Sequence, residues 1–389
     1  MIVVIADDFT GAAEIGGIGI RHGLRVVIQT RVDELKSADL LVIVAQTRSL
    51  SEVDACIKIN QISEQLKTLN PDFIYKKIDS ALRGHVLSEI KVQMQAFELD
   101  KALIVAGNPS LGRLIRDGQY TINDVPLAET GFTGDAHFPA KSSDVVEALD
   151  PKGEFGLVNL KPDDQQPQSG IVAADVSGVA DLNKWAKSPI KPVLYAGASG
   201  FFDALLSSMD IKVVSGRSAF PFGNRILFVG GTAFPKHEDF QKRLQDYGVH
   251  FSNMPEEIYR NKDFDPKVLE EWADEIVTTF ENQNVYITMR HSGSDEHGLS
   301  QRLCENLGNL VWNVTARVEM DELLIEGGDT AATVLELLKI RKLKPVHEYL
   351  TGVIRMEVMG NRNFYVTTKP GSYKWTEDIL IPRKASVLK

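Results

Sequence analysis

The sequence predicts two α/β domains, and three observations support this fold class. The chain has 389 residues, which is too long for one ordinary hydrophobic core. In its first half, short apolar runs alternate with helix-like stretches, which is typical of a doubly wound, mostly parallel sheet. A second α/β pattern starts after a stretch rich in Gly, Pro and Ser at 213–225. We therefore predict an N-terminal domain at 1–220 and a C-terminal domain at 221–389.

The strands of the first domain are expected at short apolar runs without polar alternation, as in strands buried on both faces. These runs lie at 3–6, 25–30, 40–45, 73–78, 102–107, 170–175 and 192–197. Helices are expected between them, at 11–22, 52–69 and 84–97. Two stretches, 108–135 and 150–170, are rich in turn-forming residues and are expected to be irregular. A long irregular stretch inside a compact domain is usually functional or mobile.

The second domain repeats the alternation of strands and helices from residue 225 onward. Strands are expected at 225–231, 284–289, 353–358 and 364–369. Helices are expected at 236–247, 266–282, 299–307 and 329–340. The pattern indicates a C-terminal α/β domain.

The composition limits the classes of partner. The net charge is −10 and the sequence pI is about 5.4, whereas duplex nucleic acid and anionic membranes favour clustered Lys and Arg. Neither is therefore expected as a partner. Cys56 and Cys304 lie far apart, and no Cys/His cluster predicts a zinc site or a disulfide. The start, MIVVIADD, lacks the features of a signal peptide, and no apolar run is long enough to span a membrane, so we expect a cytoplasmic protein.

Asp7 and Asp8 come directly after the first expected strand, in the stretch ADDFTGAAE. Ligands of open parallel sheets bind beyond the carboxyl ends of the strands, so these acids are candidates for a site. One of them can instead cap the helix that follows, because Asp is a favoured N-cap. A cap accounts for only one acid. The other can hold a substrate hydroxyl or act on it as general base, and this motif alone does not decide between cap and site.

A basic segment, YKKIDSALRGH, contains the end of the strand expected at 73–78. Arg can bind a carboxylate through two parallel hydrogen bonds, and the neighbouring acid and hydroxyl suit a small molecule with a carboxylate and several hydroxyls. A surface ion-pair cluster is the alternative. Because alternation along the strand directs Lys76 or Lys77 inward, we favour a substrate site. Its candidate residues are Lys77, Asp79, Ser80, Arg83 and Gly84, together with Arg113 from the bend GNPSLGR.

Three glycine-containing turns of the second domain are candidates for holding phosphate. In IEGGDTAATVLELL, glycines precede a helix start, where backbone N–H groups favour anions. Asp329 is an ordinary helix cap in the alternative interpretation, and an acid there can also orient Mg²⁺ or accept a proton. LFVGGTAFPKH is a weak signal because strand–Gly–helix turns are common, and TKPGSYKW favours a plain turn over a nucleotide contact. The candidates are Gly230, Gly231, Thr232, Ala233, Gly327, Gly328, Asp329, Thr330, Lys369, Gly371 and Ser372.

Taken in order, these segments resemble the four-carbon acid sugar kinase family. The family pattern runs DDxTGA, KxDSTLRG, PxxGR and GVPLxET, followed in the second domain by a GSxS loop, TGGDTA and a closing Lys-Ser-Gly or Lys-Pro-Gly turn. This chain has ADDFTGA, KIDSALRG, NPSLGR, NDVPLAET, GGTAFPKH, EGGDTA and KPGSY in the same order. Ala81 replaces the usual Thr, and Gly231, Thr232 and Phe234 depart from the GSxS pattern. The resemblance covers nearly the whole chain.

The resemblance implies ATP-dependent phosphorylation of a threonate, erythronate or 3-oxo-tetronate type of acid, with Mg²⁺ bridging the phosphates. It implies that 1–220 binds the acid sugar and that 221–389 binds the nucleotide. Arg83 or Lys77 is then expected to bind the carboxylate. Asp8 and Asp329 are the candidate catalytic acids, and Asp329 is favoured as base or metal organiser. No set of metal ligands is predicted.

Two alternatives stay open at this point. A nucleotide-dependent oxidoreductase also uses a doubly wound sheet, but no GxGxxG follows a strand here. The second alternative is a non-catalytic sensor of a small hydroxy acid. Acids in both halves of the chain count against it, because a protein that only binds a ligand does not need both. The sequence leaves open which stereoisomer is bound, which hydroxyl is phosphorylated and whether the chain forms a homodimer.

Overall fold

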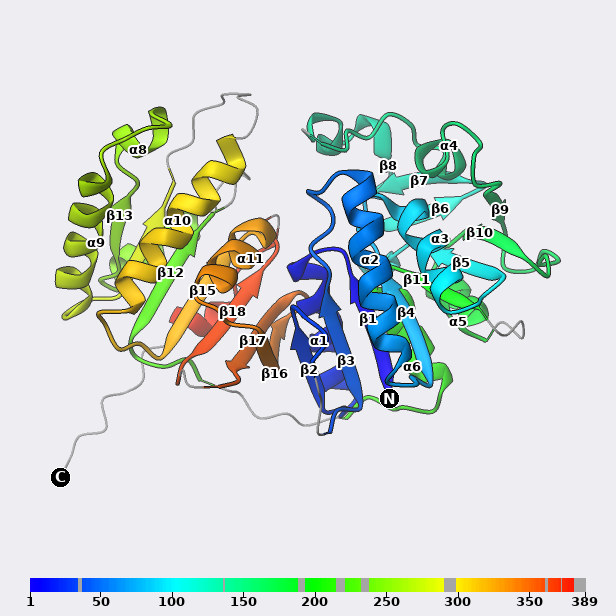
Figure 1. Cartoon of the computed structure of the whole chain (residues 1–389), viewed down its shortest axis with the longest axis horizontal. Coiled ribbons are helices and arrows are strands. Elements are labelled where there is room, and N and C mark those ends of the chain that lie inside the picture. The colour runs from blue at the N-terminus through cyan, green and yellow to red at the C-terminus, as the bar shows by residue number, and fades with distance from the viewer. Residues whose placement is uncertain are drawn as a thin grey trace. The chain divides into compact units, whose positions relative to one another are not determined.

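The computed structural model describes residues 1–33, 37–135, 137–187, 193–214, 221–231, 238–289, 299–360, 363–371 and 373–380 (Figure 1). The chain divides into two compact units, Met1–Ser215 and Gly216–Lys389. The boundary predicted at 220 falls in 215–220, outside the described residues. Each unit contains its own run of parallel strands and helices, so the predicted class of two α/β domains is confirmed.

The first unit is built on a twisted parallel sheet, as predicted for a doubly wound fold. Every neighbouring pair of its strands is parallel, and the central strands are buried along their whole length. The strands are, in spatial order, β2 (Val26–Gln29), β3 (Leu40–Val44), β1 (Ile2–Ala6), β4 (Phe73–Lys77), β11 (Leu194–Gly197), β5 (Lys101–Val105), β10 (Gly170–Ala174) and β9 (Val158–Leu160).

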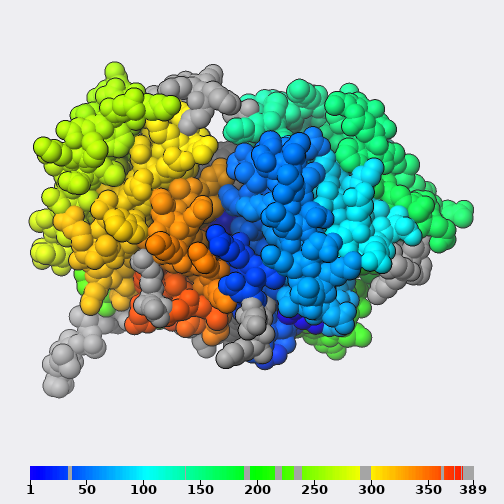
Figure 2. Space-filling view, in the orientation of Figure 1, coloured from blue at the N-terminus to red at the C-terminus, as the bar shows by residue number. Residues whose placement is uncertain are grey.

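Helices cover both faces of this sheet. On one face, α2 (Glu52–Lys67) and α3 (Val86–Ala96) bury apolar side chains against the strands and form a continuous surface toward the viewer (Figures 1 and 2). On the other face, α1 (Phe9–Arg21) packs beside α6 (Ser199–Ser208), and α5 (Val179–Ala186) packs on α6. This double cover leaves the ends of the strands as the place where polar side chains gather.

Part of the stretch expected to be irregular, 108–135, is a small antiparallel sheet. Its strands are β6 (Arg113–Arg116), β7 (Gln119–Ile122) and β8 (Val125–Pro126). Two-residue turns join them, at Asp117 and Gly118 (φ 50° and 76°) and at Asn123 and Asp124 (φ 50° and 62°). The expectation of an irregular stretch was wrong for these residues, because positive-φ residues at both central positions make tight hairpins between very short strands.

Several short elements were not expected from the sequence. In the first unit they are η1 (Pro109–Leu111), η2 (Leu127–Glu129), η3 (Gly131–Gly134), α4 (Val145–Leu149), α5, α6 and β9. Strand β9 falls within 150–170, which was expected to be irregular throughout. These elements are too short to show a clear period in the sequence.

The second unit has a mixed sheet. Its strands are, in spatial order, β13 (His250–Asn253), β14 (Val285–Thr288), β12 (Ile226–Gly230), β15 (Glu322–Glu326), β18 (Tyr365–Lys369), β17 (Val353–Val358) and β16 (Lys342–Leu350). The strands are parallel from β13 to β18, whereas β17 is antiparallel to both β18 and β16. The carboxyl ends of β12 and β15 therefore lie at one edge of the sheet.

The helices of the second unit are α7 (Glu238–Asp246), α8 (Glu256–Arg260), α9 (Pro266–Phe280), α10 (Leu299–Thr315) and α11 (Gly328–Leu337), with a short η4 (Glu377–Leu380). The helix expected at 299–307 continues to Thr315, past Gly308. A Cβ at Gly308 would lie 2.5 Å from a methyl of Leu337, so glycine allows α10 and α11 to pack closely. Among the described residues, no helix is long and apolar enough to cross a membrane.

Candidate active site

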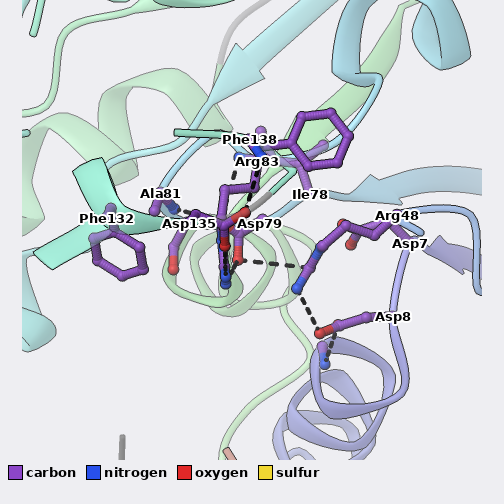
Figure 3. Close-up of polar contacts among 12 residues, drawn as sticks. Asp7, Asp8, Arg48, Ile78, Asp79, Ala81, Arg83, Phe132, Asp135 and Phe138 are labelled. Atoms are coloured by element: carbon purple, nitrogen blue, oxygen red, sulfur yellow. Dashed lines mark hydrogen bonds and ion pairs between the residues drawn. The ribbon is translucent and has the colours of Figure 1, made fainter. Parts of the chain in front are cut away.

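The carboxyl ends of β1, β3 and β4 carry the charged residues of the first unit. Strand β1 pairs with β3 on one side and with β4 on the other, so Asp7, Arg48 and Asp79 meet at one edge of the sheet (Figure 3). The N–H of Thr47 donates to the carbonyl of Asp7 at 3.0 Å, which extends the strand pairing as far as Arg48. The sequence predicted the two acids but missed Arg48, although this arginine also follows an expected strand.

Asp8 is the N-cap of α1. Its Oδ1 accepts from the N–H of Gly11 at 2.7 Å, and its Oδ2 accepts from the hydroxyl of Thr10 at 2.8 Å. The cap interpretation of the opening motif therefore holds for Asp8. A Cβ at Gly11 would lie 2.7 Å from Asp8 Oδ1 and 3.3 Å from Lys77 Nζ, so a larger residue here would displace the capping carboxylate.

Arg48 is the cation that holds the acids together. Its Nε and Nη2 donate to Asp7 Oδ2 at 2.9 and 2.7 Å. Its Nη1 lies 2.9 Å from Asp8 Oδ2, and its Nη2 lies 3.5 Å from Asp79 Oδ1. One guanidinium thus contacts three buried carboxylates from two other strand ends, which lets several of them stay ionised side by side.

The neighbouring acids Asp7 and Asp8 have pKa values shifted in opposite directions. Burial raises the pKa of Asp7, although Arg48 opposes this effect. Burial also disfavours the charge of Asp8, but Arg48, Lys77 and the N–H of Gly11 outweigh it and lower the pKa of Asp8. Asp8 is therefore a fixed negative charge, and Asp7 is the acid of the pair whose proton affinity is increased.

Arg83 is the second cation of this site. Its Nε and Nη2 donate to the two carboxylate oxygens of Asp79 at 2.9 Å each, and its Nη1 donates to Asp135 at 3.0 Å (Figure 3). The guanidinium carbon lies 5.2 Å from the ring centre of Phe132. Burial disfavours the charge of Asp79, but Arg48 and Arg83 outweigh it and hold the pKa of Asp79 well below its usual range. The acid–arginine cluster consists of Asp7, Asp8, Arg48, Asp79, Arg83 and Asp135.

The two lysines at the end of β4 are both buried, on opposite faces of the sheet. Lys76 is ion-paired with Glu89 on α3. Lys77 Nζ donates to the carbonyl of Ile78 at 2.8 Å and lies 3.8 Å from Glu14 on α1. The sequence predicted that one of the two lysines points inward, whereas the structure buries both, Lys76 against α3 and Lys77 against α1.

A chain of polar contacts leads from Lys77 to Arg113. Ser199 donates to Glu14 at 2.8 Å, and Asn108 donates to Ser199 at 3.2 Å. Asn108 and Arg113 exchange two backbone hydrogen bonds, of 2.8 and 3.1 Å. Arg113 Nε is buried without a hydrogen-bond partner among the described residues. The sequence missed Asn108 and Ser199, although each follows an expected strand.

The remaining substrate candidates of the first unit, Ser80 and Gly84, are chain neighbours of the cluster residues Asp79 and Arg83. Gly84 has a φ of 96°, and a Cβ at this position would lie 3.7 Å from Asp7 Oδ2. The carbonyl of Ser80 accepts from the hydroxyl of Tyr120. The structure therefore brings all the predicted substrate residues to one edge of the first sheet.

In the second unit, the turn after β12 lies beside the start of α11. The N–H of Gly231 donates to the carbonyl of Glu326 at 3.1 Å, and Thr330 Oγ1 donates to the carbonyl of Gly231 at 3.2 Å. A Cβ at Gly231 would lie 1.9 Å from Thr330 Oγ1, so only glycine allows this approach. Gly327, with a φ of 102°, is the N-cap of α11. The alternative of Asp329 as the cap is therefore wrong, because the helix begins earlier, at Gly328.

Lys369 ends β18 and is fully buried. Its Nζ donates to Glu326 Oε1 at 2.7 Å and to the carbonyls of Pro370 and Gly371 at 3.2 and 3.4 Å. Glu326 Oε2 accepts from the hydroxyl of Tyr286 at 3.0 Å. Burial lowers the pKa of Lys369, against the attraction of Glu326. The ammonium thus fixes the turn that contains Gly371.

The other nucleotide candidates have less defined surroundings. Gly230 ends β12, and a Cβ there would lie 2.7 Å from the hydroxyl of Tyr286. Asp329 is exposed in the first turn of α11. The predicted residues Thr232, Ala233 and Ser372 lie outside the described residues.

The two groups of residues suit different ligands. The start of α11 presents backbone N–H groups beside the glycine turns, which is the arrangement that favours phosphate. The acid–arginine cluster offers buried charges of both signs, which suits a hydroxylated acid. Among the described residues, no three His, Cys, Asp or Glu side chains are arranged to hold a metal ion.

Comparison with known proteins assigns a role to each half. The model of a sugar-binding N-terminal domain matches residues 2–205, and the model of a nucleotide-binding C-terminal domain matches residues 243–373. Fold and site thus define a class of two-domain enzymes in which one half binds a sugar and the other binds a nucleotide. The chain belongs to the four-carbon acid sugar kinase family, as its motifs indicated.

Three similar relatives are kinases. The chain is 26% identical to the D-threonate kinase of Salmonella typhimurium, over 86% of this chain and 85% of that protein. It is 28% identical to the D-erythronate kinase of Heliobacterium modesticaldum, over 41% and 38% of the two chains. It is 25% identical to a 3-oxo-tetronate kinase of Pseudomonas savastanoi, over 56% and 52%.

Solved structures share the fold over nearly the whole chain. A Salmonella typhimurium protein has a TM-score of 0.78 at 17% identity, and covers 97% of both chains. A Haemophilus influenzae protein has a TM-score of 0.73 at 17% identity, over 97% of this chain and 98% of the other. At this identity the likeness shows the fold alone.

Proposed function

We propose that this protein is an ATP-dependent kinase that phosphorylates a hydroxyl of a four-carbon acid sugar of the threonate, erythronate or 3-oxo-tetronate type. The acid–arginine cluster is the main support for the proposal, because its buried charges lie in the half that matches a sugar-binding domain. Neither the sensor nor the oxidoreductase is favoured, since the similar relatives are kinases. An ATP-dependent reaction agrees with the cytoplasmic setting expected from the sequence.

The acid sugar binds at the edge of the first sheet in this proposal. Between the two candidate cations for its carboxylate, Arg83 is the better suited, because its side chain is 25% exposed and that of Lys77 is 5% exposed. Asp79 and Asp135 accept three hydrogen bonds from the side chain of Arg83, which leaves two of the five N–H donors of a guanidinium for an incoming carboxylate. The substrate residues proposed here are Asp7, Lys77, Asp79, Ser80, Arg83, Gly84 and Arg113, and Asp8 supports them by holding Arg48.

ATP binds in the second unit in this proposal, with its phosphates at the turn of Gly231 and the start of α11. The close approach of Gly231 to Thr330 places the turn after β12 beside the start of α11, whose first backbone N–H groups have no partner within the helix and can bind phosphate oxygens. The nucleotide residues proposed here are Gly230, Gly231, Thr232, Ala233, Gly327, Gly328, Asp329, Thr330, Lys369, Gly371 and Ser372.

Mg²⁺ completes the proposed site together with ATP. The described residues offer no cage of three acids, so the phosphates would supply most of its ligands, with Asp329 as the protein carboxylate at the helix start. When bound, the ion neutralises charge on the transferring phosphoryl group. Because Asp8 already accepts from Gly11, Thr10 and Arg48, the role of base or metal organiser goes to Asp329 rather than to Asp8.

Release of ADP tests the proposal. The full chain with Mg²⁺-ATP is given D- and L-threonate, D- and L-erythronate and the 3-oxo-tetronates. Arg83→Ala is compared with Arg25→Ala, a matched control in which an exposed arginine holds Asp39 through two hydrogen bonds of 3.0 and 2.8 Å. We expect one acid to drive ADP release, Arg83→Ala to abolish it and Arg25→Ala to keep it.

Two results would contradict the proposal. ADP release that does not depend on any four-carbon acid would exclude this class of substrate. Protection of the chain against heat by one of the acids, without ADP release, would instead make the sensor the better interpretation.

A further inference from the structure

The carboxylate oxygens of the acid–arginine cluster are almost all engaged. Both oxygens of Asp8 accept hydrogen bonds, from Gly11 and from Thr10, and Oδ2 also contacts Arg48. Both oxygens of Asp79 accept from Arg83. These carboxylates have little capacity left for a ligand.

Asp135 at the outer end of the cluster is engaged in the same way. Its Oδ1 accepts from the N–H groups of His137 and Phe138 at 3.0 and 2.8 Å, and its Oδ2 accepts from Arg83.

Asp7 is the exception. Its Oδ2 accepts two hydrogen bonds from Arg48, whereas its Oδ1 is buried and has no hydrogen-bond partner among the described residues. Asp7 itself is 4% exposed. The neighbouring hydroxyl of Thr47 is also buried without a partner in this part of the chain, so it does not donate to Asp7. A buried carboxylate oxygen without a donor is costly, which indicates that a donor comes from outside the protein.

We infer that Asp7 Oδ1 accepts a hydrogen bond from a hydroxyl of the acid substrate, and that Asp8 does not contact the substrate but holds Arg48 and the start of α1. The inference rests on the proposed function and deepens it. It names the acid that recognises the hydroxylated part of the substrate and thereby separates hydroxy acids from their deoxy analogues.

The chemistry of the position selects a hydroxyl. A second carboxylate would be repelled by Asp7, whereas a hydroxyl can donate to it. The two bonds from Arg48 fix the orientation of the carboxylate, so Oδ1 is held in one place. Burial raises the pKa of Asp7, which agrees with an acceptor that lacks a donor. A site built to hydrogen-bond a hydroxyl discriminates strongly against a ligand that lacks it.

Asp7→Asn tests this inference with little change in shape. The amide oxygen can keep the bonds from Arg48, which leaves the NH₂ group at the place of Oδ1 and replaces the charged acceptor by a donor. Binding is measured by calorimetry on the full chain without ATP. The ligands are the acid with the highest turnover and its analogues that each lack one hydroxyl.

We expect Asp7→Asn to weaken binding of the parent acid by roughly tenfold or more. One deoxy analogue lacks the hydroxyl that Asp7 binds. For that analogue, Asp7→Asn should weaken binding by no more than about threefold relative to wild type. Asp8→Asn acts through Arg48, so it should weaken every analogue by the same factor. Asp39→Asn, which removes an Arg-paired carboxylate elsewhere, serves as the control.

Asp7→Ala provides a second test. It should weaken binding of every ligand except the same deoxy analogue. If Asp7→Asn or Asp7→Ala weakens all analogues equally, Asp7 only positions Arg48 and the inference is overturned while the kinase proposal stands. If no four-carbon acid binds the wild-type chain or drives ADP release, the proposed function fails and the inference fails with it.

Discussion

Asp7 and Arg48 are joined by two hydrogen bonds, of 2.9 and 2.7 Å, across 41 residues of sequence. They meet because β1 and β3 are adjacent parallel strands, so that both residues follow the same edge of the sheet. The same guanidinium reaches Asp8 and Asp79. Asp7, Asp8 and Asp79 therefore share one cation, and Arg83 adds a second charge beside Asp79.

Replacing Arg48 should destabilise the protein in a pH-dependent way. Arg48→Met leaves three buried carboxylates facing one another, and breaking a buried ion pair in this manner costs about 3–5 kcal/mol. Without Arg48 the pKa values of these acids rise, so the loss should be largest at neutral pH and shrink as pH falls toward about 4. Urea unfolding of wild type and variant across this range measures the difference.

Arg48→Lys is the matched control, because it keeps the charge but not the planar fork, and it should lose less stability. If Arg48→Met and Arg48→Lys lose the same stability, and the loss does not change with pH, Arg48 acts through packing and not through charge balance.

Asp79 should make the protein sensitive to acid. Its pKa is held well below the usual range in the folded state by Arg48 and Arg83, against the effect of burial. Its contribution to stability is therefore complete above the pKa of an unfolded Asp, about 4, and is lost as pH falls below that value. Asp79→Asn should cost on the order of 2–3 kcal/mol at pH 7 and progressively less below about pH 4, as measured by urea unfolding. Parallel pH curves for wild type and variant would contradict this prediction.

Gly231 should be essential for nucleotide binding. A Cβ at this position would lie 1.9 Å from Thr330 Oγ1, so Gly231→Ala must move the turn away from the start of α11. We expect a loss of ATP affinity of at least about tenfold, measured by calorimetry with Mg²⁺-ATP. Gly131→Ala is the control, because its Cβ would meet no atom within 4 Å. Unchanged affinity in Gly231→Ala would remove this turn from the phosphate site.

Cys304 should be unreactive toward thiol reagents in the folded protein. Burial raises its pKa to about 11, and its Sγ lies 3.4 Å from Thr330 Oγ1. Cys56 is more exposed, and both cysteines are free. We expect iodoacetamide at pH 8 to modify Cys56 first and Cys304 only on unfolding, as followed by mass spectrometry. Fast modification of Cys304 in Cys56→Ser would show that the start of α11 opens readily.

The fold was largely predictable because its strands are strongly apolar and separated by clear helices. The hairpins at 113–126 were missed because their strands have only two to four residues each. Asp117–Gly118 is nevertheless a recognisable hairpin turn, and that signal would have identified the first of them. The extension of α10 was missed because Gly308 suggests a helix end, whereas it serves close packing on α11.

The site could be predicted only where a motif was local. Asp7 and Asp8 are visible in one short stretch, but the assignment of the cap to Asp8 required the contacts of Gly11 and Thr10. The contact of Arg48 with these acids could not be predicted, because the sequence does not reveal which strands are neighbours in the sheet. Lys369 was predicted beside a nucleotide, but its pairing with Glu326 depends on β15 and β18 being neighbours.

The burial of Lys76 and Lys77 on opposite faces has a consequence for folding. Strand β4 lies between β1 and β11, and both lysines are nearly inaccessible, each beside its own acid. A slip of β4 by one residue would exchange the two faces and take Lys76 away from Glu89. An unpaired buried charge costs about 3–5 kcal/mol, so misaligned sheets would be strongly disfavoured. The two lysines thus set the register of the central strand, and a correctly aligned sheet is what places the site residues at one edge.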